Sequence, residues 1–183
     1  IGRARYLASD ETIRNRRNTI IKLPMQINDI DSAFKAAETI LNLATEEAEV
    51  AASARDEKES AELAEAWGKG ATGRGMATGG SKAIKDLEKE QKSRATRMIR
   101  DSIDGALVDI ATLYRDVMFL QSGTQGALIN QEFASDISKM AERIPAAKTV
   151  LKIDAIMSAR KNLSHNAAPL LTLEALMCQL AQA

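Results

Sequence analysis

The sequence predicts an all-α fold, and three observations lead to this prediction. Aromatic residues make up 3% of the chain, and there are only three prolines among 183 residues. Alanine, leucine, glutamate, lysine and arginine, which favour helices, are abundant. No segment alternates apolar and polar residues as a half-buried strand would. We therefore expect a long antiparallel helical hairpin over about residues 30–121, followed by a compact C-terminal three-helix bundle.

The first predicted helix follows Ser9, which suits an N-cap because acidic residues come directly after it. It should run to about Lys22, because the residue before Pro24 avoids the α conformation. Asp29 or Asp31 can cap the next, long helix. Apolar residues recur along that helix with the 4-3 spacing of a heptad, which predicts a packing seam. The seam consists of Ile30, Phe34, Ala37, Leu41, Ala44, Ala48 and Ala51.

The second arm of the hairpin is predicted to begin near Ser81 and to end at the segment QSGTQG, residues 121–126. Three shorter helices should follow. Asn130 is expected to cap the first of them, and Pro145 suits the first turn of the second. Pro169 should open the last helix, which carries leucines at helical spacing.

The glycine-rich segment WGKGATGRGMATGGSKA, residues 67–83, joins the two arms and contains two patterns that resemble nucleotide sites. G-x-G-x-x-G from residue 68 matches a dinucleotide-binding turn, and G-x-x-x-x-G-S-K from residue 75 resembles a P-loop with its last two residues exchanged. Both motifs require a preceding strand to place the phosphates, whereas the segment AELAEAW before them is helical in character. We therefore predict a hairpin tip over residues 68–80 and expect no cofactor.

Charge is distributed unevenly, although Lys plus Arg equals Asp plus Glu at 25 each. Residues 31–66 hold ten acids and three bases, a net charge of −7, whereas residues 67–100 hold nine bases and three acids, a net charge of +6. Antiparallel arms would bring these opposite charges together. The basic arm could instead make a weak DNA contact, although no aromatic side chains interleave for base stacking. The residues concerned are Lys89, Lys92, Arg94 and Arg97.

Residues capable of catalysis or metal binding are isolated in this sequence. His165 is the only histidine and has no suitably spaced partner, so a loop or capping role is expected. Cys178 is the only cysteine, and its apolar neighbours predict an inert, buried thiol. We expect no catalytic, cofactor or metal site and no enzyme activity in this chain. A single cysteine fits a reducing compartment, and no run approaches the roughly 20 apolar residues of a membrane span.

Three stretches of the sequence, in their order, carry a resemblance to a known family. They are QKSRATRMIRDSIDGALVDIATLYRDVMFLQSG at 91–123, LIN at 128–130 and SARKNLSHNAAPLLTLEALMCQL at 158–180. This ordered set resembles the C-terminal region of the delta-prime subunits of bacterial DNA polymerase III, in their actinobacterial form. The segment GRARYLASDE also resembles the end of that family's lid domain. The candidate structural or interface residues are Tyr114, Arg115, Asp116, Asn130 and Asn166.

The resemblance implies a cytoplasmic bacterial protein that acts in DNA replication as part of a clamp loader. Residues 1–9 would be the tail of an AAA+ lid domain, in its sensor-2 region, and residues 10–183 would form a helical collar domain. The collar would pack with those of the gamma/tau and delta subunits into a ring. The sliding clamp and primed DNA would be contacted only through the whole complex, and no membrane is implied.

Three features stand apart from this family pattern. The chain begins at Ile1 rather than at methionine, so we expect a piece of a longer polypeptide whose AAA+ part lies upstream. The Ser-Arg-Cys motif that supplies the family's arginine finger is absent from these residues. The charged hairpin is also longer than a minimal collar requires. The alternative is therefore an unrelated helical-hairpin adaptor whose charged arms bind a partner protein.

Overall fold

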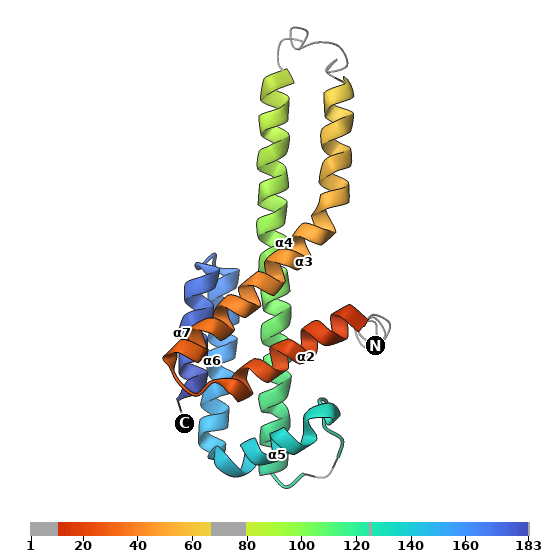
Figure 1. The fold of residues 1–183 in the computed structure, drawn as a ribbon. Helices are drawn as coiled ribbons and strands as arrows, with labels where there is room; N and C mark the ends of the chain where they lie inside the picture. Colours follow the sequence, from red (N-terminus) through yellow and green to blue (C-terminus); the bar gives the residue numbers. More distant parts are fainter. Residues whose placement is uncertain (1–10, 67–79, 125, 183) are drawn as a thin grey trace. The chain divides into compact units, whose positions relative to one another are not determined.

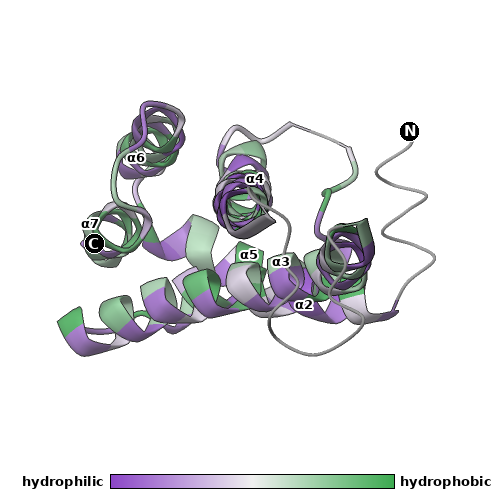
Figure 2. Cartoon of the chain, turned by 90° about the horizontal axis from the view of Figure 1, so that it is seen from above, coloured by the Kyte–Doolittle hydropathy of each residue, from purple (hydrophilic) through white to green (hydrophobic). Residues whose placement is uncertain are grey.

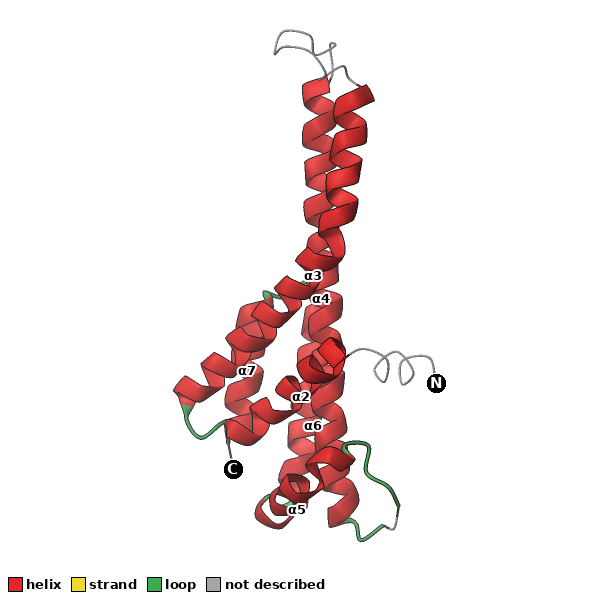
Figure 3. Ribbon diagram, turned by 45° about the vertical axis from the view of Figure 1, so that its right-hand side comes forward, coloured by secondary structure: helices red, strands yellow, loops and turns green. Residues whose placement is uncertain are grey.

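The computed structural model describes residues 11–66, 80–124 and 126–182, and every regular element in these ranges is a helix (Figure 1). The all-α prediction is therefore confirmed, and Figure 3 shows the same result by secondary structure. The helices, in chain order, are α2 (Glu11–Gln26), α3 (Ile30–Ala66), α4 (Gly80–Gln121), the 3-10 turn η1 (Gln131–Phe133), α5 (Ala134–Arg143), α6 (Ala146–Ser164) and α7 (Pro169–Ala181).

The chain divides into two compact units, and the two longest helices contribute to both. The first unit combines the chain up to Leu43 with everything from Ile103 onward, and the second spans Ala44–Ser102. The second unit therefore consists of the later part of α3 and the first part of α4, lying antiparallel as predicted (Figure 3). Most of the predicted tip and the predicted lid tail, residues 68–79 and 1–9, lie outside the described residues.

The core of the first unit is built around the second half of α4. Helices α2, α5, α6 and α7 gather around this part of α4 (Figure 1). Figure 2 shows that the helices carry both hydrophobic and hydrophilic residues, so each can bury one face and solvate another. Each large apolar side chain buried in this way contributes about 1.5–3 kcal/mol. The large aliphatic residues of α4 that are fully buried are Ile103, Leu107, Ile110, Leu113 and Val117.

Helix α2 continues past the point where the sequence predicts its end. It runs to Gln26 and contains Pro24, so the prediction that this proline ends the helix was wrong. Proline removes a backbone hydrogen bond and costs a helix about 3 kcal/mol. Burial of Pro24 together with Ile20 and Ile21 offsets that cost, because tertiary packing supplies most of a helix's stability.

Helix α3 begins with a reciprocal cap. The backbone N–H of Ser32 donates to the Asp29 carboxylate at 2.8 Å, and the backbone N–H of Asp29 donates to the Ser32 hydroxyl at 3.0 Å. This is the capping-box arrangement, so Asp29, one of the two predicted caps, is the residue used. The hydrogen bonds from Ser32 also lower the pKa of the Asp29 carboxyl.

The buried face of α3 differs from the predicted seam. Ala37, Ala44 and Ala48 are buried as expected, but Ile30 and Phe34 are 67% and 43% exposed. The seam prediction was therefore wrong for Ile30 and Phe34, and also for Ala51, which is exposed. Small side chains form the buried face because they let a neighbouring helix approach closely, which leaves the large ones outside. The buried face consists of Ala33, Ala36, Ala37, Ile40, Ala44, Ala48 and Ala52.

Candidate functional site

A buried polar cluster forms where α4 meets the chain leading into η1, and it contains three of the candidate residues. The Asp116 carboxylate is fully buried on α4. It accepts hydrogen bonds from the backbone N–H groups of Ile129 at 3.1 Å and Asn130 at 2.8 Å. The Asn130 side-chain amide donates to it at 2.9 Å and the Arg115 guanidinium at 2.7 Å. Four donors offset the cost of burying this charge.

Asn130 lies at the centre of this cluster, and its side chain binds other members of the cluster instead of capping a helix. It precedes η1 as predicted, but its side chain makes no capping hydrogen bond. The side chain is fully buried, and its amide donates both to Asp116 and to the Thr112 hydroxyl, at 2.9 and 3.2 Å. Asn130 therefore occupies the predicted N-cap position, but its side chain does not cap the turn, because the side-chain oxygen that would accept a capping N–H accepts from Arg17 instead.

Arg17 of α2 completes the cluster, and sequence reasoning did not find it. Its guanidinium donates to the Asn130 side-chain oxygen and, at 3.0 Å, to Glu132. It also lies 3.5 Å from the buried Asp109 carboxylate. Nothing in the local sequence distinguishes Arg17 from the arginines beside it. The arrangement joins α2, α4 and η1 through paired charges, and its carboxylates are engaged in hydrogen bonds and ion pairs, so it suits positioning rather than proton transfer.

Tyr114 lies outside this cluster, although it is adjacent in sequence. Its ring is 1% exposed and lines a cavity of about 220 Å³ together with Met140, Arg143 and Lys152. Burial raises the pKa of the Tyr114 phenol, so it is uncharged at neutral pH. Each residue of a helix is turned by about 100° from the one before it, so Tyr114 and Asp116, two positions apart, point to nearly opposite sides of α4.

Asn166 has a local structural role at the end of α6. Its φ of 65° places it in the left-handed region, which asparagine tolerates better than most residues. Its N–H bonds the Leu163 carbonyl, and the N–H of Ala167 bonds the Asn162 carbonyl, both at 3.1 Å. These two bonds form a Schellman motif. His165, the preceding residue, is the C-cap, so its predicted capping role is confirmed.

Cys178 is only half-buried, so the predicted burial of its thiol was wrong in degree. It lies on α7 between positions whose side chains are buried, and the helical period turns it partly toward solvent.

The basic arm of the second unit contains a residue that is paired across the hairpin and others that are exposed. Arg94 is held by Asp56 at 2.6 Å and by Glu59 at 2.5 Å, across the two arms. Gln91 adds a hydrogen bond to the Asp56 carbonyl at 3.1 Å. Arg94 is thus engaged within the hairpin, and the predicted pairing of opposite charges is confirmed there. The other three candidate DNA contacts, which are exposed, are Lys89, Lys92 and Arg97.

We call the ion pair between Arg94 and Glu59 the Arg94 clasp, and we expect it to persist at acidic pH. The side-chain hydrogen bond from Arg94, followed by that from Arg55, lowers the pKa of Glu59 from its ordinary value of 4.5 to about 2. A carboxyl whose pKa is lower in the folded state stabilises that state above its unfolded pKa. This contribution should be fully present above pH 4.5 and should be lost as the pH falls toward 2.

An NMR titration of the Glu59 side-chain carbon tests this expectation. In the intact chain its midpoint should lie near pH 2, and in Arg94→Gln it should rise toward 4.5. Arg55→Gln serves as the matched variant and should raise the midpoint less, because its hydrogen bond is the smaller cause. An unchanged midpoint in Arg94→Gln would contradict the clasp.

Large apolar side chains are exposed on two helices of the first unit. Ile30 and Phe34 lie one turn apart on α3, and Val150, Leu151 and Met157 lie on α6. At 61%, Leu151 is more exposed than Val150 or Met157, at 46% and 43%. Helical spacing puts the three α6 residues on one side of that helix. Exposed apolar surface of this kind is typical of protein interfaces.

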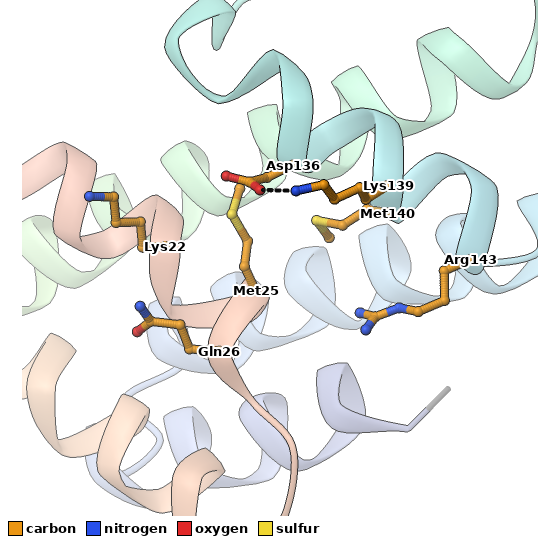
Figure 4. Close-up of a pocket in the computed structure, with 7 residues that line it drawn as sticks. All are labelled: Lys22, Met25, Gln26, Asp136, Lys139, Met140 and Arg143. Atoms are coloured by element: carbon orange, nitrogen blue, oxygen red, sulfur yellow. Dashed lines mark hydrogen bonds and ion pairs between the residues drawn. The ribbon is translucent and has the colours of Figure 1, made fainter.

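A cleft of about 430 Å³ lies between α2 and α5 of the first unit (Figure 4). Met25 and Met140 face one another across it, with Lys22 and Arg143 at opposite ends. Asp136 and Lys139 form an ion pair at 3.5 Å along its side. Its lining is thus apolar between the helices and mainly cationic around them.

Among the described residues, no group of three or more histidine, cysteine or acidic side chains is placed to hold a metal ion. In the same ranges, no helix combines the length and apolar character needed to cross a bilayer. Comparisons with models of protein families, with curated proteins and with solved structures found no match.

Proposed function

We propose that this chain is a collar-type oligomerisation domain of a clamp-loader subunit of the delta-prime kind. In this proposal it has no catalytic role of its own and acts in the bacterial cytoplasm. It packs with the collars of gamma/tau and delta, and the assembled ring places the sliding clamp on primed DNA.

The observation that supports this proposal is the exposed apolar surface of α3 and α6 on an otherwise well-packed helical unit. The polar cluster around Asp116 is satisfied internally, so it does not call for a ligand. The large side chains on α3 and α6, in contrast, are 43–67% exposed. Assembly would remove them from water, and this is the main favourable term in association.

The test is to mix this chain with the collar region of gamma/tau from the same source and to measure the mass by light scattering after gel filtration. A hetero-oligomer is expected at tens of micromolar. Val150→Asp with Leu151→Asp should weaken the assembly at least about tenfold, since a charge would be buried without a partner. The matched variant is Val50→Asp, because Val50 is 79% exposed on the second unit and lies off the proposed interface.

Two outcomes would contradict the proposal. The first is that the two proteins in the mixture remain separate. The second is that Val50→Asp disrupts assembly as strongly as the double substitution on α6. Circular dichroism of each variant excludes unfolding as the cause.

The helical-hairpin adaptor remains the second candidate, and the charged second unit favours it. Lys89 and Lys92 are exposed on the same arm that carries the Arg94 clasp. An adaptor that binds through its arms would lose its partner on Lys89→Glu with Lys92→Glu, whereas a collar would retain gamma/tau. Binding of gamma/tau by this double variant therefore distinguishes a collar from an adaptor.

A further inference from the structure

We propose that the cleft between α2 and α5 binds an acidic, amphipathic segment of a partner protein. Apolar side chains of that segment would lie on the methionines, and its carboxylates would meet the surrounding cations. This proposal is independent of the collar assembly, because it uses a different surface of the first unit.

The space available extends beyond the cleft itself. The 430 Å³ cleft and the 220 Å³ cavity beside Tyr114 are both lined by Met140 and Arg143, so they adjoin along α5. Together they reach from Lys22 on α2 to Lys152 on α6. We call this joined surface the α5 groove. Its extent suits a short peptide rather than a single small ion.

The charge of the α5 groove is strongly unbalanced. Lys22, Lys139, Arg143 and Lys152 line it, whereas Asp136 is its only acid and is already paired with Lys139. Among the described residues, neither Lys22 nor Arg143 has a carboxylate within ion-pair distance. The Lys22 ammonium group lies over the Phe133 ring, 5.9 Å from its centroid, but this contact leaves its charge without a carboxylate neighbour. Exposed cations without a neighbouring carboxylate favour an anionic ligand.

The interior end of the groove shows the same imbalance. The ammonium group of Lys152 is directed to the Leu180 and Gln182 carbonyls, at 2.7 and 2.5 Å, and among the described residues no acid lines this end of the groove. Burial, and then the positive charges of Lys148 and Arg143, lower the pKa of Lys152. An added carboxylate would relieve this repulsion.

Tyr114 also lines the groove, and its side chain is almost fully buried there. Figure 4 shows the apolar part of the groove, where Met25 and Met140 lie between Lys22 at one end and Arg143 at the other.

The apolar part of the groove favours a peptide over a nucleic acid. Methionine is flexible and polarisable, so the half-buried Met25 can adapt to leucine-like or aromatic side chains, with the nearly buried Met140 beside it. A single-stranded nucleic acid would instead need exposed aromatic rings for base stacking. The one aromatic side chain in the lining, Tyr114, is buried.

The test uses a rhodamine-labelled peptide of repeated Glu-Glu-Leu-Leu and fluorescence anisotropy with the full chain. We expect saturable binding that Lys22→Glu with Arg143→Glu weakens at least about tenfold. Lys35→Glu with Lys58→Glu is the matched variant, because it changes net charge equally at exposed lysines of α3 and should leave binding unchanged. A peptide with Gln in place of Leu should bind more weakly, since it cannot use the methionines.

Three results would overturn the proposal. The Glu-Glu-Leu-Leu peptide would not bind the intact chain, or both double variants would lose affinity equally. In the third, labelled oligothymidylate would bind at least as tightly and lose affinity in the same variant, which would assign the groove to nucleic acid. Lys22 and Arg143 are exposed, so their replacement should not unfold the chain, and circular dichroism checks this.

Discussion

Asp116→Ala is expected to lower the free energy of unfolding by about 3–5 kcal/mol. The change removes a buried acceptor and leaves two backbone N–H groups and the Asn130 amide without their partner. Each of these donors is buried or half-buried, so water cannot fully replace the carboxylate. The residues leading into η1 should also become less ordered, because Asp116 is what holds their backbone against α4.

Urea denaturation followed by circular dichroism measures this loss. The matched variant is Asp101→Ala, because Asp101 lies on the same helix but is exposed. Its effect should remain within about 0.5 kcal/mol. A loss below about 1 kcal/mol for Asp116→Ala would show that the cluster contributes little to the fold.

Arg17→Ala is expected to cost about 2–4 kcal/mol, since it breaks a largely buried charge pair. The Arg17 side chain is 13% exposed and its partner Asp109 is 7% exposed. Without the guanidinium, Asp109 would lose a positive neighbour and Asn130 would lose a donor to its side-chain oxygen. The attachment of α2 to α4 should therefore weaken.

The neighbouring Arg14 supplies the control, because it lies one turn earlier on α2 and is exposed. Arg14→Ala should change stability by no more than about 0.5 kcal/mol. A double-mutant cycle between Arg17→Ala and Asn130→Ala should give a coupling energy of at least about 1 kcal/mol. Additive effects would mean that the contact between α2 and the cluster is not energetically significant.

The wrong predictions share a physical cause. At Pro24 the local preference is to end a helix, and burial of Ile20 and Ile21 outweighs it. Along α3 the heptad spacing identified a helix but could not say which of two adjacent faces is buried. The structure buries the alanine-rich face and leaves Ile30 and Phe34 exposed, and those exposed residues now carry the proposed function.

The sequence alone determined the helical character of this chain, an aspartate cap at Asp29 or Asp31, the break after Gln121 and the start of the last helix at Pro169. These features depend on residues within one or two helical turns, so composition and spacing are enough to predict them. Only the tertiary structure brought Arg17 to Asn130 and placed Met25 opposite Met140, across more than a hundred residues of sequence. Such contacts depend on how helices pack, and no local pattern records which faces will meet.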